Sequence, residues 1–238
     1  MRTVLLSSLF AAAVVGADTT SLIGDGGLAA WKQPTHDWLI VGAAALDGAD
    51  QKKLTLSDGA GVLANGRKGH TGNLVSAAEF GDAQIHVEWL VPKGSNSGVY
   101  VMGRYEVQVL DSFGTATPGS GDAGGIYQRW DPKRGQGKEG FEGHPPRVNA
   151  AKAPGEWQVF DITFTAPRFD AAGVKTANAV FVKVVHNGQV VHENVEVTGP
   201  TRSSLWEYDA EKPTGPLMLQ GDHGPVVYRN ITVTPLGN

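Results

Sequence analysis

Short stretches in which apolar and polar residues alternate recur along the chain, and turns rich in glycine and proline separate them. Alternation with a period of two places apolar side chains on one face of a β-strand. The 32 glycines and 13 prolines among 238 residues supply the turns. No segment has the apolar spacing of a convincing amphipathic helix. Because many short strands with regular turn signals are typical of an antiparallel sandwich, we predict an all-β fold of two antiparallel sheets.

Ten strands are expected, over residues 38–43, 72–76, 84–91, 98–102, 104–111, 157–165, 179–186, 189–197, 217–220 and 226–234. Asn187-Gly188 lies between two of them and predicts a tight hairpin, because type I′ turns need positive φ at both central residues. Met102-Gly103 is expected to form a tight turn between the strands on either side of it.

The strand that follows Met102-Gly103 has the strictest alternation. One face carries Tyr105, Val107 and Val109. The other face carries Arg104, Glu106 and Gln108. Because charged side chains are seldom buried in a sheet without partners, this polar row predicts either an internal ion pair or a ligand groove. Glu106 is then either the ion-pair partner of Arg104 or a general base, and the pattern alone slightly favours the ion pair.

Two further regions could contribute to such a groove. Residues 84–91 alternate in the same way, so His86 and Glu88 would extend the polar face if that strand lay beside residues 104–111. Asp222 and His223 follow a predicted strand in a glycine-flanked turn and form either an acid–base pair or an ordinary hydrogen-bonded turn. The remaining histidines are assigned to solvent or to strand faces without function. They include His36, His70, His186 and His192.

The connection over residues 112–154 is unusually long for a compact domain, and such loops are often functional. It contains Tyr127, Trp130, His144 and Asn149. Aromatic rings beside a polar groove suit a sugar, whose C–H face stacks on them. Alternatively, these side chains only anchor the loop to the sandwich.

The first seventeen residues have the features of a signal peptide. Arg2 supplies the charged start, residues 4–15 the apolar centre, and Val15-Gly16-Ala17 a small-residue cleavage site. We expect an exported protein, periplasmic or extracellular, with residues 18–238 forming a single domain.

Composition excludes several classes of partner and site. The chain has no cysteine, which excludes disulfides and thiolate metal sites. A formal net charge of −4 with scattered cations argues against nucleic acid and membrane partners. We predict no cofactor and no metal site, with a hard cation such as calcium as the only alternative. The pattern predicts no particular oligomeric state.

Motifs spread over nearly the whole mature chain resemble one family, the 3-keto-disaccharide hydrolase domain family. They are residues 22–31, 79–82, 96–98, 104–112, 154–157, 166–170, 186–188, 219–225 and 229–231. Gly24-Asp25-Gly26 departs from the family's usual Asn-Gly-Lys, which affects an opening turn and not the polar strand. The resemblance implies a concanavalin A-like jelly-roll sandwich and cleavage of glycosides oxidised at C3.

The implied reaction removes the acidic C2 proton, eliminates the C1 substituent and adds water. Glu106 would be the base, Arg104 the oxyanion partner and His223 the acid. The substrate-binding candidates are Gln108, Glu88, Tyr127, Trp130, Asn149, Gln220 and Asp222.

Two other classes of function remain open. A direct glycosidase of the glucanase type needs two carboxylates flanking the scissile bond. The spacing from Glu106 to Asp111 matches the glucanase strand only loosely, because an amide occupies the middle position. A non-catalytic carbohydrate-binding module is the third class, and the charged acid–base set weighs mildly against it.

Overall fold

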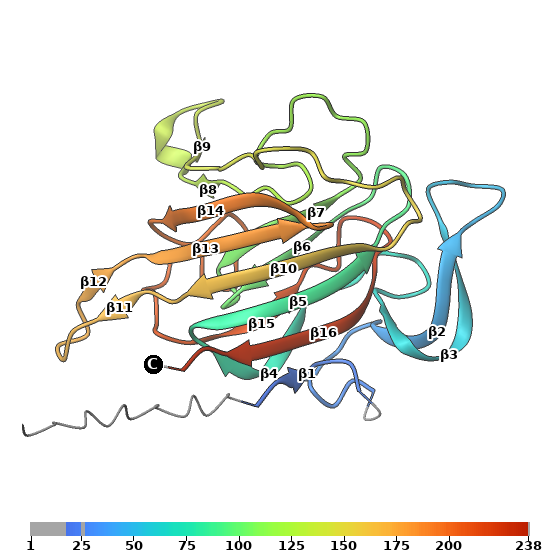
Figure 1. Ribbon diagram of the computed structural model, residues 1–238, viewed down its shortest axis with the longest axis horizontal. Coiled ribbons are helices and arrows are strands. Elements are labelled where there is room, and N and C mark those ends of the chain that lie inside the picture. Colours follow the sequence, from blue (N-terminus) through green and yellow to red (C-terminus); the bar gives the residue numbers. More distant parts are fainter. Residues whose placement is uncertain (1–17, 25–26, 238) are drawn as a thin grey trace, which may run out of the picture.

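A computed structural model describes residues 18–24 and 27–237, so the predicted signal peptide lies outside the described residues. Most of the described chain is strand and turn. The larger sheet contains β1 (Thr20–Ser21), β2 (Leu39–Leu46), β3 (Leu54–Ala64), β5 (Ala83–Leu90), β10 (Gln158–Thr165), β13 (Ala179–His186), β14 (Gln189–Val197) and β16 (Val227–Pro235). Their order is β14-β13-β10-β5-β16-β3-β2, with β1 beside β16 (Figure 1).

The smaller sheet has the order β4-β15-β6-β7. Its strands are β4 (Leu74–Phe80), β6 (Asn96–Val101), β7 (Tyr105–Leu110) and β15 (Gly215–Leu219). The paired strands of both sheets run antiparallel, so the predicted all-β sandwich of two antiparallel sheets is confirmed.

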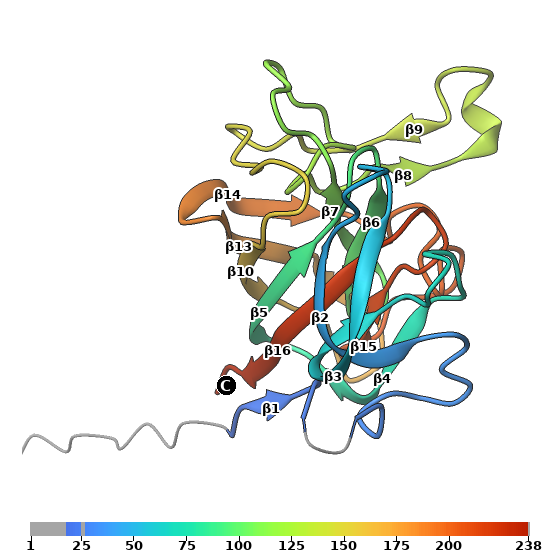
Figure 2. The ribbon, with the colours of Figure 1, turned by 90° about the vertical axis from the view of Figure 1, so that its right-hand side faces the viewer.

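Short elements decorate the sandwich. They are β8 (Arg129–Trp130), the 3₁₀ turn η1 (Pro132–Arg134), β9 (Gly140–Phe141), β11 (Arg168–Phe169) and β12 (Lys175–Ala177). The β8–β9 hairpin and its neighbouring loops stand above the sheets in Figures 1 and 2. The long connection after β7 is therefore not without structure, because it contains a hairpin of its own.

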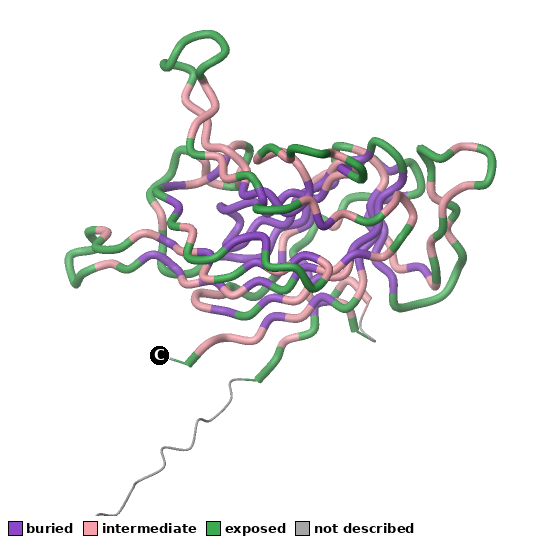
Figure 3. Tube along the Cα trace, turned by 45° about the horizontal axis from the view of Figure 1, so that its top comes forward, coloured by how far each residue is buried: buried purple, intermediate pink, exposed green. Residues whose placement is uncertain are grey.

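The core lies between the two sheets, where buried stretches concentrate in the middle of the molecule (Figure 3). Tyr105 of β7 packs on Phe164 of β10, with ring centroids 5.5 Å apart. Val107 and Val109 are fully buried in the same core. The alternation along β7 thus turns these three residues inward, as predicted.

Two hairpin turns match the sequence prediction. Met102 and Gly103 have φ of 55° and 63°, and Asn187 and Gly188 have φ of 49° and 81°. Positive φ at both central residues is the requirement of a type I′ turn. The second turn joins β13 to β14, whose bounds coincide with the predicted strands.

Strand β3 was not predicted, because glycines and polar residues interrupt its sequence. The reason for one glycine is a close approach within the β2–β3 hairpin, since a Cβ on Gly59 would overlap the backbone of Gly42. The missing side chain lets the two strands pair where a larger residue would separate them.

Candidate active site

A cavity of about 170 Å³ opens on the outer face of the smaller sheet. The sheet side is lined by Asn96, Tyr100, Glu106, Gln108 and Gln220. The loop side is lined by Tyr127, Arg202, Ser203 and His223. The structure therefore brings together five of the predicted site residues, which come from segments far apart in the sequence.

Glu106 lies at the base of this cavity with 1% of its surface exposed. It pairs across the β6–β7 ladder with Tyr100, whose side chain shares the same face. The pKa of Glu106 is raised to about 8, mainly by burial and also by the negative charge of Asp222, while the hydrogen bond from Tyr100 opposes the rise. A carboxyl group with a pKa near neutrality in a cavity is suited to proton transfer.

Gly98 makes room for that carboxyl group. It lies on β6 beside Glu106, and a Cβ at this position would overlap the carboxylate of Glu106. The Asn96–Gly98 motif is therefore part of the cavity wall, where a side chain on the third residue would displace the charged group.

Asp222 and His223 follow β15, and His223 lines the cavity. Their Oδ1 and Nδ1 atoms are 2.6 Å apart, and the contact leaves Nε2 of His223 as the nitrogen that can meet a ligand. Asn65 holds the turn by donating to the carbonyls of Gly221 and Gly224, at 3.0 and 2.8 Å. The predicted Asp222–His223 pair is formed, and the turn places it within reach of Glu106 electrostatically.

Residues 124–127 bring Tyr127 to the cavity by running beside β7. The backbone N–H of Gln108 donates to the Gly125 carbonyl at 2.9 Å, and the backbone N–H of Tyr127 donates to the Glu106 carbonyl at 3.0 Å. Ile126 of the same stretch is fully buried in the core. Part of the long loop after β7 is thus both an anchor and a wall of the site.

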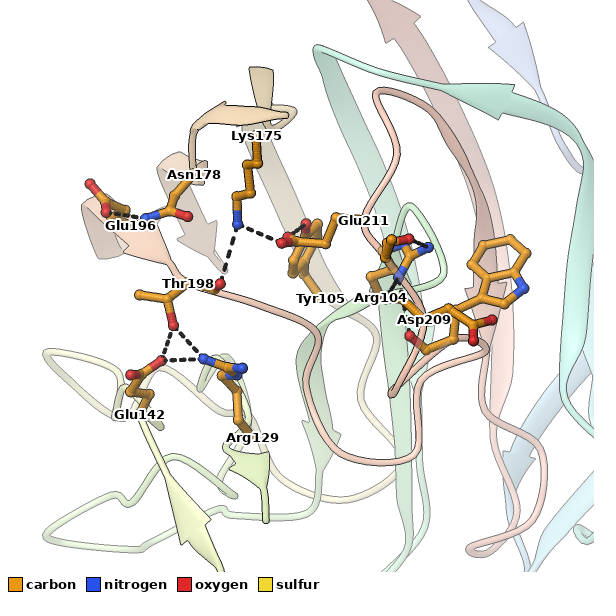
Figure 4. A network of polar contacts seen from close by, with 12 residues as sticks. Arg104, Tyr105, Arg129, Glu142, Lys175, Asn178, Glu196, Thr198, Asp209 and Glu211 are labelled. Carbon is orange, nitrogen blue, oxygen red and sulfur yellow. Dashed lines mark hydrogen bonds and ion pairs between the residues drawn. The ribbon is translucent and has the colours of Figure 1, made fainter. Parts of the chain in front are cut away.

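Arg202 and Ser203 reach the cavity on a connection that we call the 198–211 segment, after its residues. Arg202 lies over the ring of Trp130 at 3.8 Å, which fixes its guanidinium beside the cavity. Hydrogen bonds from Thr198 to Glu142 and from Tyr105 to Glu211 tie the ends of the segment to the fold (Figure 4).

Arg104 holds the middle of the 198–211 segment and does not line the cavity. Its buried guanidinium donates to the carbonyls of Trp206, Asp209 and Ala210 at 3.1, 3.3 and 2.8 Å (Figure 4). The expected ion pair with Glu106 is absent from the described structure. The prediction that Arg104 faces the groove is therefore corrected, because Arg104 lies in the turn before β7 begins and its guanidinium is engaged by the segment.

Replacing Arg104 with Met should lower the free energy of unfolding by about 3 kcal/mol, because three carbonyls lose a charged donor. Urea unfolding measures the change. Arg67→Met is the matched control, since Arg67 makes an exposed ion pair with Asp58 and its loss should change stability by about 1 kcal/mol or less. Equal losses of unfolding free energy in the two variants would contradict the role of Arg104 in holding the 198–211 segment.

Besides Arg104 and Asp222, three predicted site residues lie outside the cavity lining. Glu88 is on β5 of the larger sheet, where Arg229 and Asn230 donate to it at 2.6 and 2.7 Å. Strand β5 lies between β10 and β16, so the expectation that His86 and Glu88 extend the polar face of β7 is wrong.

The other two residues are in the long loop. Asn149 anchors it by donating to the carbonyls of Ser112 and Thr115. Trp130 acts on the cavity only through Arg202. Tyr127 thus lines the cavity, as expected for a sugar-stacking residue, whereas Trp130 contacts Arg202 and does not line the cavity.

His186 and His192 are also corrected, because both are buried and not at the surface of the strands. Each is at most 3% exposed, and burial lowers the pKa of each to about 4. His192 contacts the carbonyl of Gly124 at 2.8 Å, so it supports the stretch that carries Tyr127.

Four residues of the cavity were not predicted from the sequence: Asn96, Tyr100, Arg202 and Ser203. Tyr100 could have been found, because the tight Met102-Gly103 turn fixes the register that pairs it with Glu106. The sequence offers no comparable signal for Arg202 and Ser203, which arrive on an irregular segment.

A larger hollow of about 370 Å³ lies on the outer face of the larger sheet and contains the pair His86–Asp161. We place the site in the smaller cavity for a chemical reason. Among the described residues, buried side-chain oxygens without a hydrogen-bond partner occur in three residues of the smaller cavity and in none that line the larger hollow. Unsatisfied buried groups indicate that a ligand supplies the missing bonds.

The described part of the chain contains no group of three or more metal-ligating side chains placed to hold an ion. It also contains no helix long and apolar enough to cross a bilayer. The expected absence of a cofactor stays a prediction.

Comparisons with known proteins give one family and several similar folds. The sequence model of a family described as a 3-keto-alpha-glucoside-1,2-lyase-like domain matches residues 18–234. No curated protein matches the chain.

Two solved proteins of Parabacteroides distasonis ATCC 8503, both provisionally designated glycosyl hydrolases, share the fold. The first is 29% identical with a TM-score of 0.63, over 92% of this chain and 84% of that chain. The second is 18% identical with a TM-score of 0.58, over 92% of this chain and all of that chain. The β-glucanase of Bacillus licheniformis is 10% identical with a TM-score of 0.43, over 94% of this chain and all of that chain. The two antiparallel sheets of the structure and the family match confirm the expected jelly-roll fold.

Proposed function

Because the chain belongs to the 3-keto-alpha-glucoside-1,2-lyase-like domain family, we propose that it cleaves glycosides oxidised at C3 by removing the proton at C2. The family and the solved relatives place the chain among carbohydrate-active, glycosyl hydrolase-like proteins. The observation that carries the specific proposal is the buried Glu106, with a pKa of about 8, in a cavity that also contains a cation.

The reaction begins at the C2–H bond. A carbonyl at C3 acidifies this proton, so the Glu106 carboxylate takes it and the bonding electrons form an enolate with the C3 oxygen. Positioned cations stabilise developing oxyanions. Arg202 is the cation that lines the cavity, and we assign it the role that the sequence had suggested for Arg104.

The second half of the reaction breaks the C1–O bond. The enolate electrons return to form a C1–C2 double bond, and the leaving oxygen takes a proton from His223. The product is a 1,2-unsaturated 3-ketosugar, and water adding across the double bond gives the free 3-ketosugar. Asp222 orients His223 through the contact at Nδ1.

The two alternative functions receive less support from the site. A glycosidase of the glucanase type needs two carboxylates at the scissile bond, whereas Glu106 is the one carboxylate among the nine residues that line the cavity. A binding module needs no buried group with a pKa near neutrality. Proton abstraction needs a single carboxylate with a pKa near neutrality, so it accounts for both the lone Glu106 and its raised pKa.

Incubation with a glycoside and its 3-keto derivative tests the proposal. Only the 3-keto compound should be cleaved, because the parent sugar cannot form an enolate. In deuterium oxide, the product should carry deuterium at C2, which nuclear magnetic resonance detects. Cleavage of both sugars at similar rates without deuterium at C2 would favour the glycosidase, and cleavage of neither would favour the binding module.

We also propose that the protein is exported to the periplasm or the extracellular space. The support is the sequence of residues 1–17, and mass spectrometry of the exported protein should give a mature start at or near Asp18. Exported protein that retains residues 1–17 would refute the cleavage site.

A further inference from the structure

Three carboxamide side chains in the cavity lack partners. The oxygens of Asn96, Gln108 and Gln220 are buried and accept no hydrogen bond from the described residues. Gln108 and Gln220 are 4% and 8% exposed, so little bulk water reaches them. Buried amides in native proteins are usually paired, and each exception calls for an explanation.

The other buried carboxamides of the described chain are satisfied by the protein. The side chain of Asn65 makes three hydrogen bonds to the backbone, and the oxygen of Gln158 accepts from Lys152 and Asn187. Asn149 likewise bonds to backbone groups on both sides of its loop. The unpaired carboxamides therefore gather at this cavity and are not a general property of the fold.

The backbones of the three residues are fixed although their side chains are free. Asn96 donates to the His223 carbonyl, Gln108 to the Gly125 carbonyl, and Gln220 to the Gly98 carbonyl. They stand on the polar side of the smaller sheet or at its edge, next to Glu106. Recognition groups on rigid elements bind with little loss of conformational entropy.

The cavity is small and holds little positive charge. At about 170 Å³, it lies below the ~300–1,000 Å³ of pockets for drug-sized ligands, which suits one sugar ring with its aglycone outside. Arg202 is the one Lys or Arg side chain in the lining, and the carboxylate of Asp222, which contacts His223, would repel an anionic sugar. Neutral carboxamides pair with hydroxyl groups, which both donate and accept.

We infer that Asn96, Gln108 and Gln220 select a single neutral sugar ring by hydrogen bonding to its hydroxyl groups. The aglycone lies outside the cavity and is not selected by these residues. This inference rests on the proposed function, since it takes the cavity to be a sugar site. It adds the residues that set the specificity and the class of sugar, a neutral hexoside in preference to a uronic acid.

Calorimetric titration with methyl α-D-glucopyranoside tests the inference in a Glu106→Gln background. That background removes the carboxylate needed by either cleavage reaction, so failure of the elimination proposal does not affect the binding test. Gln108→Met and Gln220→Met should each weaken binding about tenfold, because each removes hydrogen bonds to the sugar. Gln84→Met on the exposed face of β5 is the matched control and should leave binding unchanged.

Thermal unfolding separates recognition from a structural role. Met has a similar shape and replaces a group that is unsatisfied in the free protein, so the two cavity variants should keep or raise Tm. Lower Tm with unchanged sugar binding would show that the amides are structural and would overturn the inference.

Deoxy sugars provide a measurement that needs no change to the amides. At least one of the 4-deoxy and 6-deoxy glucosides should bind about tenfold more weakly than the parent sugar. In the variant that lacks the carboxamide partner of that hydroxyl, the deoxy sugar and the parent sugar should bind with equal affinity. The inference would be overturned if the affinity losses from each amide variant and each deoxy sugar simply added in every pair. It would also be overturned if the methyl glucuronide bound more tightly than the glucoside, or if none of these sugars bound.

Discussion

Replacing Glu106 with Gln should lower kcat on a 3-keto-glycoside by about 10²–10⁴-fold, the usual contribution of a general base. The amide keeps the shape of the side chain and removes the group that accepts the C2 proton. The fold should survive, because burial already favours the neutral form of Glu106 and Gln is also neutral. Steady-state kinetics with circular dichroism as a check of folding would measure the effect.

Glu88→Gln is the matched control for this change. Glu88 is also a strand carboxylate paired across a ladder, but it lies on the larger sheet with Arg229 and should not affect turnover. A comparable loss in both variants, or full activity of Glu106→Gln, would remove Glu106 from the role of base.

The same assignment fixes the pH dependence of the reaction. A base must be ionised in the free enzyme, so kcat/KM should rise about tenfold per pH unit below the Glu106 pKa of about 8. Asp222→Asn removes a charge that raises the pKa of Glu106, so it should move this limb to lower pH. A profile that falls from pH 6 to pH 8 would instead indicate that protonated Glu106 acts as the acid.

Acid should destabilise the fold strongly through His186 and His192. Burial lowers the pKa of each from 6.5 to about 4, so the folded protein holds both neutral while the unfolded chain takes up protons below pH 6.5. Their stabilisation is therefore complete above pH 6.5 and is lost as the pH falls to about 4. A shift of that size corresponds to about 3 kcal/mol for each residue.

Urea unfolding between pH 7 and pH 4 measures this loss. His192→Gln should flatten the acid limb, because Gln cannot take up a proton and can still bond to the Gly124 carbonyl. His70→Gln serves as the control, since His70 is exposed and should leave the limb unchanged. An acid limb identical in the protein with and without His192 would contradict the prediction.

Both histidines adjoin Gly124, which gives the acid transition a structural consequence. The carbonyl of Gly124 meets His192, and a Cβ on Gly124 would contact Nδ1 of His186. Charging either ring would loosen residues 124–127, and Tyr127 would leave the cavity wall with them. Loss of sugar binding should therefore accompany or precede unfolding in acid.

Local pattern determined a large part of this protein. The alternation along residues 104–111 set which side chains face the core, because neighbouring side chains of a strand must point to opposite faces. It therefore predicted Glu106 and Gln108 as polar groups on the outer face. Asn187-Gly188 predicted its hairpin, because few other dipeptides readily tolerate positive φ at both positions, and Met102-Gly103 predicted a tight turn between two strands.

Only the tertiary structure decided which strands share a sheet and which loops meet at the cavity. Strand β5 and strand β7 have the same alternation, yet they lie in opposite sheets, so the polar faces that look alike in sequence point away from each other. Arg104 does not face the groove as expected but donates to carbonyls of the 198–211 segment, and Arg202 of that segment lines the cavity. Alternation is a local property, whereas sheet order and loop docking depend on contacts between residues about a hundred positions apart, which period and composition do not encode.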